Sequence, residues 1–206
     1  MQEQETFNLI KRLKAISDIG LLYAPNEYDQ ERYEEILQIS YELLHLVTGT
    51  ETNLLQDLFV ESKEYPTAKV DVRGLIIKDD TILLVKEMSD NKWSLPGGWA
   101  DIGYSPKEVI IKECREETGL DIVPERMLAV FDKKFHPHPP QPFYVYKMVI
   151  SCKTISTAIH TGFDVLDVQY FDIKNLPELS EDRILKSQLE IAFQIATMPG
   201  MDTYFD

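Results

Sequence analysis

The sequence predicts an α/β protein in which a mixed sheet lies between helices, preceded by a small all-helical domain. Apolar side chains recur at helical spacing through the N-terminal third of the chain. After Pro66, which cannot continue a helix, the pattern changes to the alternation of β-strands. Two capped helical segments then interrupt the strands. We therefore expect a helical domain over residues 1–64 and an α/β sandwich over residues 65–206.

Composition narrows the possible functions of the chain. Of its 206 residues, 44% are hydrophobic, which is usual for a globular protein. The formal net charge is −14, whereas proteins that bind a phosphate backbone usually carry a net positive charge. We therefore do not expect duplex DNA as a partner. Two cysteines, Cys114 and Cys152, are too few for a disulfide framework. No basic and apolar leader or bilayer-spanning run is present, so we expect a cytoplasmic protein with no membrane partner.

The N-terminal domain is predicted to hold three helices, of which the second covers residues 26–47 and the third residues 52–62. The first is expected to end at Gly20 and Pro25, because both residues disfavour helix. So short a domain can hardly bury all its apolar surface alone. We expect it to pack on the second domain, on a second subunit or on both, and we favour a homodimer. The apolar stripe of the first helix consists of Phe7, Ile10, Leu13, Ile16 and Ile19.

The second domain is predicted to contain strands joined by turns, and a final helix. The proline-rich residues 136–142 must form a loop. Its two histidines, His136 and His138, have no third ligand nearby, so zinc is disfavoured. Ser180 is expected to cap the last helix, which runs to residue 196. The predicted strands cover residues 69–77, 81–86, 126–134, 143–152 and 164–171.

One stretch, residues 97–120, organises this domain. It begins as a glycine loop and continues as a helix with clear start and stop signals. Ser105 is a good N-cap, Pro106 suits the first helical position, and Glu108 completes a capping box. Gly119 suits the left-handed residue that ends the helix.

Three carboxylates, Glu113, Glu116 and Glu117, lie on one face of this helix, because their spacing is i, i+3 and i+4. Clustered like charges repel unless a cation lies among them, and oxygen ligands suit Mg²⁺ or Mn²⁺. A solvated acidic helix face would show the same pattern. The preceding glycine loop favours the metal site, because exposed backbone groups beside a metal suit a diphosphate.

These residues resemble the Nudix box, whose glycines, aliphatic positions and three glutamates are matched from Gly98 to Leu120. Two positions differ: Tyr104 replaces a glutamate, and Lys112 replaces an arginine. In the family those two positions generally form an ion pair that braces the loop against the helix. We expect Lys112 to pair with Glu108 instead, and Tyr104 to pack or hydrogen-bond locally.

The resemblance implies an α/β/α sandwich and metal-dependent hydrolysis of a nucleoside diphosphate linked to another group. It implies Mg²⁺ or Mn²⁺ held by Glu113, Glu116, Glu117 and the Gly98 carbonyl. The general base stays open among the three glutamates, Asp164 and Asp167. Arg73 is predicted either to face solvent or to reach the substrate. The predicted substrate contacts are Arg73, Trp99, Asp101, Lys133 and Tyr144.

A second resemblance concerns the substrate. The helical N-terminus, the strand from Lys69 and the loop around Tyr104 are similar to a bacterial Nudix subgroup that includes CDP-choline pyrophosphatase. This implies cleavage of CDP-choline to CMP and phosphocholine, and aromatic faces suit the quaternary ammonium of choline. The alternatives are ADP-ribose hydrolysis, RNA processing, and an inactive Nudix domain that senses a ligand.

Overall fold

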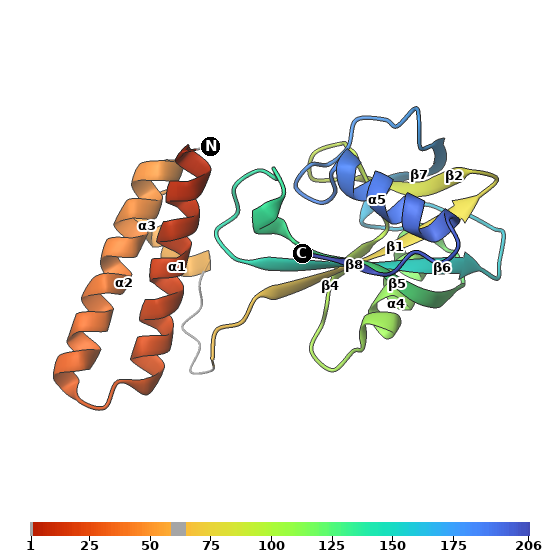
Figure 1. The fold of residues 1–206 in the computed structure, drawn as a ribbon. Coiled ribbons are helices and arrows are strands. Elements are labelled where there is room, and N and C mark those ends of the chain that lie inside the picture. Colours follow the sequence, from red (N-terminus) through yellow and green to blue (C-terminus); the bar gives the residue numbers. More distant parts are fainter. Residues whose placement is uncertain (1, 59–64) are drawn as a thin grey trace. The chain divides into compact units, whose positions relative to one another are not determined.

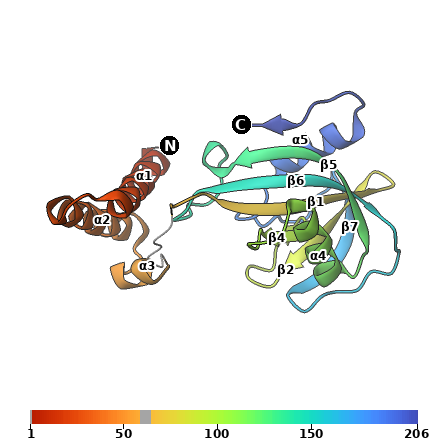
Figure 2. The same ribbon diagram turned by 90° about the horizontal axis from the view of Figure 1, so that it is seen from below.

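The computed structural model describes residues 2–58 and 65–206, and divides into two compact units (Figures 1 and 2). One unit contains Met1–Ala68 with Pro140–Phe143, and the other contains Lys69–Pro139 with Tyr144–Asp206. The boundary that we expected at residue 64 lies outside the described residues. Among the described helices, none combines the length and apolar character needed to cross a membrane.

Within residues 2–58, the first unit contains three helices, as predicted. Asn26 caps the second helix by accepting a hydrogen bond from the Asp29 amide at 2.9 Å, and Gly49 ends it in the left-handed conformation. Any continuation of the third helix beyond residue 58 lies outside the described residues. The helices are α1 (Gln2–Tyr23), α2 (Glu27–Thr48) and α3 (Thr52–Leu58).

The prediction that Gly20 ends the first helix is wrong. The α1 helix continues to Tyr23, and a Cβ atom on Gly20 would lie 2.3 Å from the Tyr33 ring on α2. Glycine is therefore used here for close helix packing rather than as a breaker. The apolar stripe is only partly buried, because Phe7 and Ile10 belong to the core while Ile16 is 51% exposed. The small core consists of Phe7, Ile10, Tyr41, Leu44 and Leu55.

The second unit is built on a mixed sheet organised around β1 (Lys69–Lys78). Along one edge β1 pairs in parallel with β6 (Val145–Thr154). Along the other edge its N-terminal part pairs with β4 (Gly97–Trp99) and its last residues with β2 (Thr81–Glu87). The remaining strands are β3 (Trp93–Ser94), β5 (Ile122–Asp132), β7 (Val165–Asp172) and β8 (Tyr204–Phe205).

Two helices cover opposite faces of this sheet, α4 (Pro106–Thr118) and α5 (Lys186–Thr197) (Figure 1). Because side chains alternate along a strand, Val72 of β1 belongs to the core beneath α4 while Leu75 belongs to the core beneath α5. Asp71 and Arg73 share the face of Leu75. The predicted α/β sandwich is therefore confirmed.

The predicted limits of α4 are also confirmed. The Glu108 amide donates to Ser105 Oγ at 3.3 Å, and the Ser105 amide donates to Glu108 Oε2 at 2.8 Å, which completes the capping box. Gly119 follows the helix with φ of 71°.

The predicted start of the last helix is wrong, since α5 begins at Lys186 rather than at Ser180. The Ser180 hydroxyl instead donates to Asp90 Oδ2 at 2.7 Å, and residues 181–183 form a turn. The short strand β8, which pairs with β5 at Ala129 and Val130, was not predicted. It is too short for its alternation to be read from sequence.

Gly97 places β4 unusually close to β1. It has φ of +135°, and a Cβ atom would lie 2.1 Å from the Val72 carbonyl oxygen. Gly103, in the loop that follows, also has a positive φ of +93°, but a Cβ atom there would meet nothing within 4 Å. Gly97 therefore combines a conformational requirement with a steric one, and Gly103 has only the first.

We predict that Gly97→Ala destabilises this domain more than Gly103→Ala. The Gly103 variant should lose about 1–3 kcal/mol from backbone strain alone. The Gly97 variant adds a collision with backbone, which no rotamer change relieves. Urea unfolding followed by tryptophan fluorescence measures both, since Trp93 and Trp99 both lie in this domain. Equal losses in the two variants would contradict the prediction.

Candidate active site

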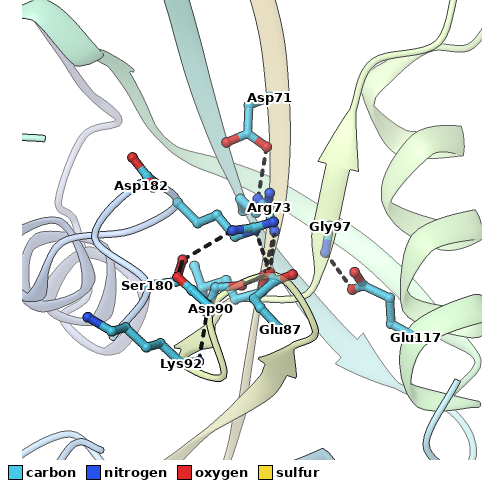
Figure 3. A network of polar contacts seen from close by, with 12 residues as sticks. Asp71, Arg73, Glu87, Asp90, Lys92, Gly97, Glu117, Ser180 and Asp182 are labelled. Carbon is cyan, nitrogen blue, oxygen red and sulfur yellow. Dashed lines mark hydrogen bonds and ion pairs between the residues drawn. The ribbon is translucent and has the colours of Figure 1, made fainter. Parts of the chain in front are cut away.

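The site lies where α4 meets the glycine residues of β4. The Gly97 amide donates a hydrogen bond of 2.8 Å to Glu117 Oε2 (Figure 3). A Cβ atom on Gly98 would lie 3.1 Å from Glu113 Oε2, so any larger residue would crowd that carboxylate. The structure thus brings Gly98, Glu113 and Glu117 together, as expected from the sequence.

Glu113 and Glu116 both lie near the side-chain ammonium of Lys112. Lys112 Nζ lies 3.9 Å from Glu113 Oε1 and 3.9 Å from Glu116 Oε2. Glu117 instead accepts the hydrogen bond from the Gly97 amide, and the residue is buried, with only 4% of its surface exposed. The three carboxylates therefore occupy one helix face but point to different partners.

Lys112 does not pair with Glu108, so that prediction is wrong. Glu108 is occupied by the capping box, while Lys112 Nζ lies 3.3 Å from Asp101 Oδ2 in the preceding loop. Lys112 Nζ also lies 5.9 Å from the centre of the Tyr104 ring. Its bond to Asp101, with the attraction of Glu116 and Glu113, raises the pKa of Lys112 above its usual value. The loop is therefore braced by an ion pair and a cation–π contact.

A network of buried charges lies beside the glycine loop, on the α5 face of the sheet (Figure 3). Arg73, only 6% exposed, donates to Asp71 Oδ1 at 2.8 Å and to the Leu95 carbonyl at 3.0 Å. Arg73 Nη1 also lies 3.7 Å from Glu87 Oε1, and the same Glu87 oxygen pairs with Arg183 Nε at 2.9 Å. The expectation of a solvent-facing Arg73 is therefore wrong.

Asp71 also accepts a hydrogen bond from Lys147, which is fully buried on β6. Burial, opposed by the nearby Asp71, lowers the pKa of Lys147 to about 8. Burial would raise the pKa of Asp71, but Arg73 and Lys147 hold it below its usual value of 3.8. The pair is thus charged at neutral pH and depends on both partners being present.

The charge of Arg73 in this network also affects the pKa values of carboxylates on α4. Burial raises the pKa of Glu117 to about 8, although the positive charge of Arg73 and the Gly97 amide oppose that rise. Burial likewise raises the pKa of Glu113. Carboxylates that are desolvated in this way gain from a bound cation, because it restores the charged form.

The remaining predicted substrate contacts are dispersed around the site. Trp99 directly follows Gly98 and is 47% exposed, with Lys69 Nζ 5.5 Å from its ring centre. Lys133 follows β5, and its Nζ donates to the Asp182 carbonyl at 2.6 Å. Tyr144 precedes β6 and is half-buried. Asp101 is exposed and bonded to Lys112.

Sequence reasoning missed Asp71, Glu87, Lys147 and Arg183 as parts of this region. Lys147 offered one signal: it interrupts an apolar strand at a position that shares the parity of buried residues. A lysine there requires a buried partner. The identity of that partner depends on the parallel pairing of Asp71 with Lys147, which is not encoded locally.

The donors fit a hard divalent cation in kind, since they are carboxylates beside a glycine carbonyl. The positively charged Lys112 ammonium already lies near two of these carboxylates, Glu113 and Glu116. Among the residues that the structure describes, no three His, Cys, Asp or Glu side chains are gathered closely enough to hold a metal as they stand. Binding would therefore require these carboxylates to turn toward the ion.

Comparison with known proteins places this fold and site in a class. The NUDIX domain matches residues 67–189, and the "UDP-X-like, N-terminal oligomerisation domain" matches residues 4–59. The chain therefore belongs to the Nudix hydrolase family, whose members hydrolyse nucleoside diphosphates linked to another group and generally use divalent cations. Its helical first unit corresponds to the N-terminal oligomerisation domain.

Individual relatives match all or part of this chain. The protein of Bacillus subtilis (strain 168) named "Putative ADP-ribose pyrophosphatase YjhB" is 41% identical over 95% of this chain and 94% of its own length. A UDP-X diphosphatase crystal structure is 34% identical, covers 100% of both chains and has a TM-score of 0.65. An ADP-ribose pyrophosphatase structure from Streptococcus suis is 33% identical, covers 68% of this chain and 100% of its own, and has a TM-score of 0.61.

We predict that Asp71→Asn destabilises the Nudix domain by about 3–5 kcal/mol, because it leaves the Lys147 charge buried without its partner. Urea unfolding followed by tryptophan fluorescence would measure the loss. Adding Lys147→Met should recover much of it, because the unpaired charge is then removed. A loss below about 1 kcal/mol for the single variant would contradict the buried pairing.

The same variant has an expected pH dependence. The pKa of Asp71 lies below 3.8 in the folded protein, so its contribution is fully present above that pH. It is lost as the pH falls through the lower folded value. The stability difference between wild type and Asp71→Asn should therefore narrow in strong acid. It should also narrow as the pH rises toward 8, because Lys147 without Asp71 loses its proton at a lower pH than the paired Lys147 of wild type, whose pKa is about 8.

Proposed function

We propose that this protein is a Mg²⁺- or Mn²⁺-dependent pyrophosphohydrolase, and that Glu113, Glu116, Glu117 and the Gly98 carbonyl hold the cation. The observation that supports this is the close contact of two α4 glutamates with the glycine residues of β4. When bound, the ion would neutralise the diphosphate and acidify a water molecule. Water would attack one phosphorus and give its proton to one of the nearby carboxylates, while the bond from that phosphorus to the bridging oxygen breaks and the bridging oxygen leaves on the other phosphate.

The protein's own groups serve this reaction by position and charge. The brace from Lys112 to Asp101 and Tyr104 holds the loop that carries Trp99. Arg73 fixes the Leu95 carbonyl, two residues before Gly97, so it orients the loop from beneath. We therefore treat Arg73 as a positioning residue. Trp99, Asp101, Lys133 and Tyr144 remain the proposed substrate contacts.

The proposed substrate is CDP-choline, cleaved to CMP and phosphocholine. Its quaternary ammonium suits an exposed aromatic face, and Trp99 is such a residue beside the glycine loop, already facing the Lys69 ammonium. ADP-ribose is the second candidate, because the Bacillus subtilis and Streptococcus suis relatives are named for it. The name of the UDP-X diphosphatase structure adds UDP-linked compounds to the set.

Purified protein with Mg²⁺ should be tested against CDP-choline, ADP-ribose, a UDP-sugar and a short RNA. We expect release of CMP from CDP-choline at the highest kcat/KM, with no turnover after EDTA and recovery on adding Mg²⁺. Faster turnover of ADP-ribose or the UDP-sugar would replace the proposed substrate. Stabilisation by a ligand without turnover of any compound would favour a sensor instead.

The matched control is Glu117→Gln, which should abolish turnover while the fold survives. The amide can still accept the Gly97 hydrogen bond. Because the pKa of Glu117 is about 8, replacing it with a neutral group should cost little stability in the metal-free protein. Circular dichroism would verify the fold. Wild-type turnover in this variant would refute the site assignment.

We also propose that residues 1–64 form the contact of a homodimer. Each long helix leaves an apolar stripe exposed on one face, because its members are spaced by whole turns. On α1, Leu9, Ile16 and Tyr23 are 61%, 51% and 66% exposed. On α2, Tyr28, Ile39 and Leu46 are 74%, 43% and 76% exposed. Such surface suits burial against a second copy.

Sedimentation equilibrium should show a dimer of the full chain, with a mass of twice 23.8 kDa. Ile16→Glu should give the monomer mass, because it places a charge in the middle of the α1 stripe. Far-UV circular dichroism should be unchanged, since Ile16 is half exposed within the helix. A wild-type monomer at micromolar concentration would refute the proposal.

A further inference from the structure

The segment between β5 and β6 is bonded through two side chains to the turn of residues 181–183. His138 Nδ1 lies 2.6 Å from the Glu181 carbonyl oxygen. Lys133 Nζ donates to the next carbonyl, that of Asp182, also at 2.6 Å. Two consecutive carbonyls of one turn therefore hold His138 and Lys133.

The contact with Glu181 fixes the hydrogen-bonding role of each nitrogen of the His138 ring. A carbonyl oxygen can only accept, so Nδ1 carries the proton and donates it. Burial, opposed by this bond, lowers the pKa of His138 to about 3, so the ring is neutral at physiological pH. In a neutral ring with its proton on Nδ1, the Nε2 atom is a hydrogen-bond acceptor.

This acceptor has no donor in the described part of the chain. The Nε2 atom is buried without a hydrogen-bond partner, and His138 as a whole is only 6% exposed. A buried acceptor without a donor costs free energy. The ring is nevertheless well fixed, because the His138 amide donates to the His136 carbonyl at 2.7 Å and His136 Nε2 lies 2.9 Å from Asp206 Oδ2. The unsatisfied acceptor is therefore held at a defined position.

The proposed substrate contact Trp99 lies on the same face of the sheet as the buried charges. Side chains of directly paired residues point to one side of a sheet. Asp71 of β1 pairs with Trp99 of β4 and with Lys147 of β6. Lys147 pairs in turn with Phe131 of β5. A row of four side chains thus crosses the α5 face, starting from the residue that follows Gly98.

His138 lies at the β5 end of this row. It follows β5 in the chain and is bonded to the turn that precedes α5. That turn lies on the same face, because Arg183 pairs with Glu87, which is 3.7 Å from Arg73 (Figure 3). Strands β1 and β6 therefore separate the His138 end from Gly98, the proposed ligand of the cation.

The proposed substrate restricts which group can donate to this acceptor. The quaternary ammonium of choline carries no N–H, so that end of CDP-choline cannot donate to His138. The nucleoside has donors in its base and in its ribose hydroxyls. The ribose adjoins the phosphates, whereas the base is the outermost part of the nucleoside. With the diphosphate at Gly98, the base is the group that extends farthest toward the β5 end.

We propose that His138 Nε2 accepts a hydrogen bond from an N–H group of the substrate's nucleobase, and so determines specificity at the nucleoside end. This inference rests on the proposed function, because it takes the diphosphate to lie at Gly98. The cytosine 4-amino group supplies such an N–H in CDP-choline. Because Nε2 is covered, the base must displace a neighbouring side chain to reach it.

Calorimetric titration with CMP and Mg²⁺ tests this contact without turnover. His138→Asn keeps an amide N–H where Nδ1 bonds to Glu181 but removes the acceptor at Nε2. We expect this variant to bind CMP about 10- to 100-fold more weakly than wild type, because the N–H of the base loses its partner. His138→Gln, whose amide oxygen can occupy the Nε2 position, should recover much of the affinity.

The matched control is His45→Asn, because His45 Nδ1 also contacts a carbonyl, that of Thr50 at 2.9 Å, but lies in the N-terminal unit. It should bind CMP as wild type does. Phosphocholine, which has no nucleobase, should bind equally to His138→Asn and wild type. Weaker binding of both ligands to His138→Asn would reflect a general disturbance of the site and would overturn the assignment to the base.

Two analogues of CMP identify the donor. The pyrimidin-2-one ribonucleotide lacks the 4-amino group, and 2′-deoxy-CMP lacks one ribose hydroxyl. Loss of the amino group should weaken binding to wild type but make little difference to His138→Asn. If loss of the hydroxyl alone gave this pattern, His138 would serve the ribose and the proposal would fail. Equal affinity of wild type and His138→Asn for CMP would also overturn it, and would indicate a buried water at Nε2.

Failure of this proposal can be told apart from failure of the proposed function. Hydrolysis of CDP-choline together with unchanged CMP binding by His138→Asn would overturn the nucleobase contact alone. Binding of CMP through His138 without hydrolysis of any compound would support the contact and overturn the enzymatic function. If ADP-ribose proves the better substrate, AMP and the purine ribonucleotide without the 6-amino group take the place of CMP and its analogue, with the same expected pattern.

Discussion

The hydrogen bond from the Gly97 amide to Glu117 is the interaction on which the rest of the site depends. This bond joins the last turn of α4 to Gly97, where the loop that leads into α4 begins. The two ends of residues 97–117 are therefore held together. Holding them together requires α4 to approach the sheet closely. A Cβ atom on Gly74 would lie 3.0 Å from Ile110, and one on Gly97 would collide with the Val72 carbonyl. Close packing therefore requires glycine at these positions, and this packing brings the α4 glutamates to the glycine loop.

This close packing also explains why charges are buried nearby. Residues of β1 alternate between the two faces, so Val72 packs under α4 while Arg73 lies on the other side of the sheet. There Arg73 is enclosed by Asp71 and Glu87, and these acids are in turn paired with Lys147 and Arg183. The ion pairs compensate one another's desolvation, and the net positive charge of Arg73 moderates the rise in the pKa of Glu117.

Features encoded by neighbouring residues could be predicted from the sequence. The limits of α4 follow from Ser105, Glu108 and Gly119, which act within one helical turn of each end. Strand periodicity likewise located β1 and β2. Features that depend on distant partners could not be predicted. Ser180 has the chemistry of a helix cap but bonds to Asp90, and no local pattern reveals that Lys147 lies beside Asp71.

The altered brace shows what the loop requires of its helix. The Nudix box has an arginine and a glutamate where this chain has Lys112 and Tyr104. Here Asp101 supplies the anion and Tyr104 the ring face, so a cation on α4 is retained while its partners have moved. Lysine is a compact charge on a flexible stem, unlike the planar fork of arginine. The Lys112 ammonium can therefore contact Asp101, Glu113 and Glu116 at the same time. The same positive charge thus braces the loop and neutralises two glutamates of the proposed metal site.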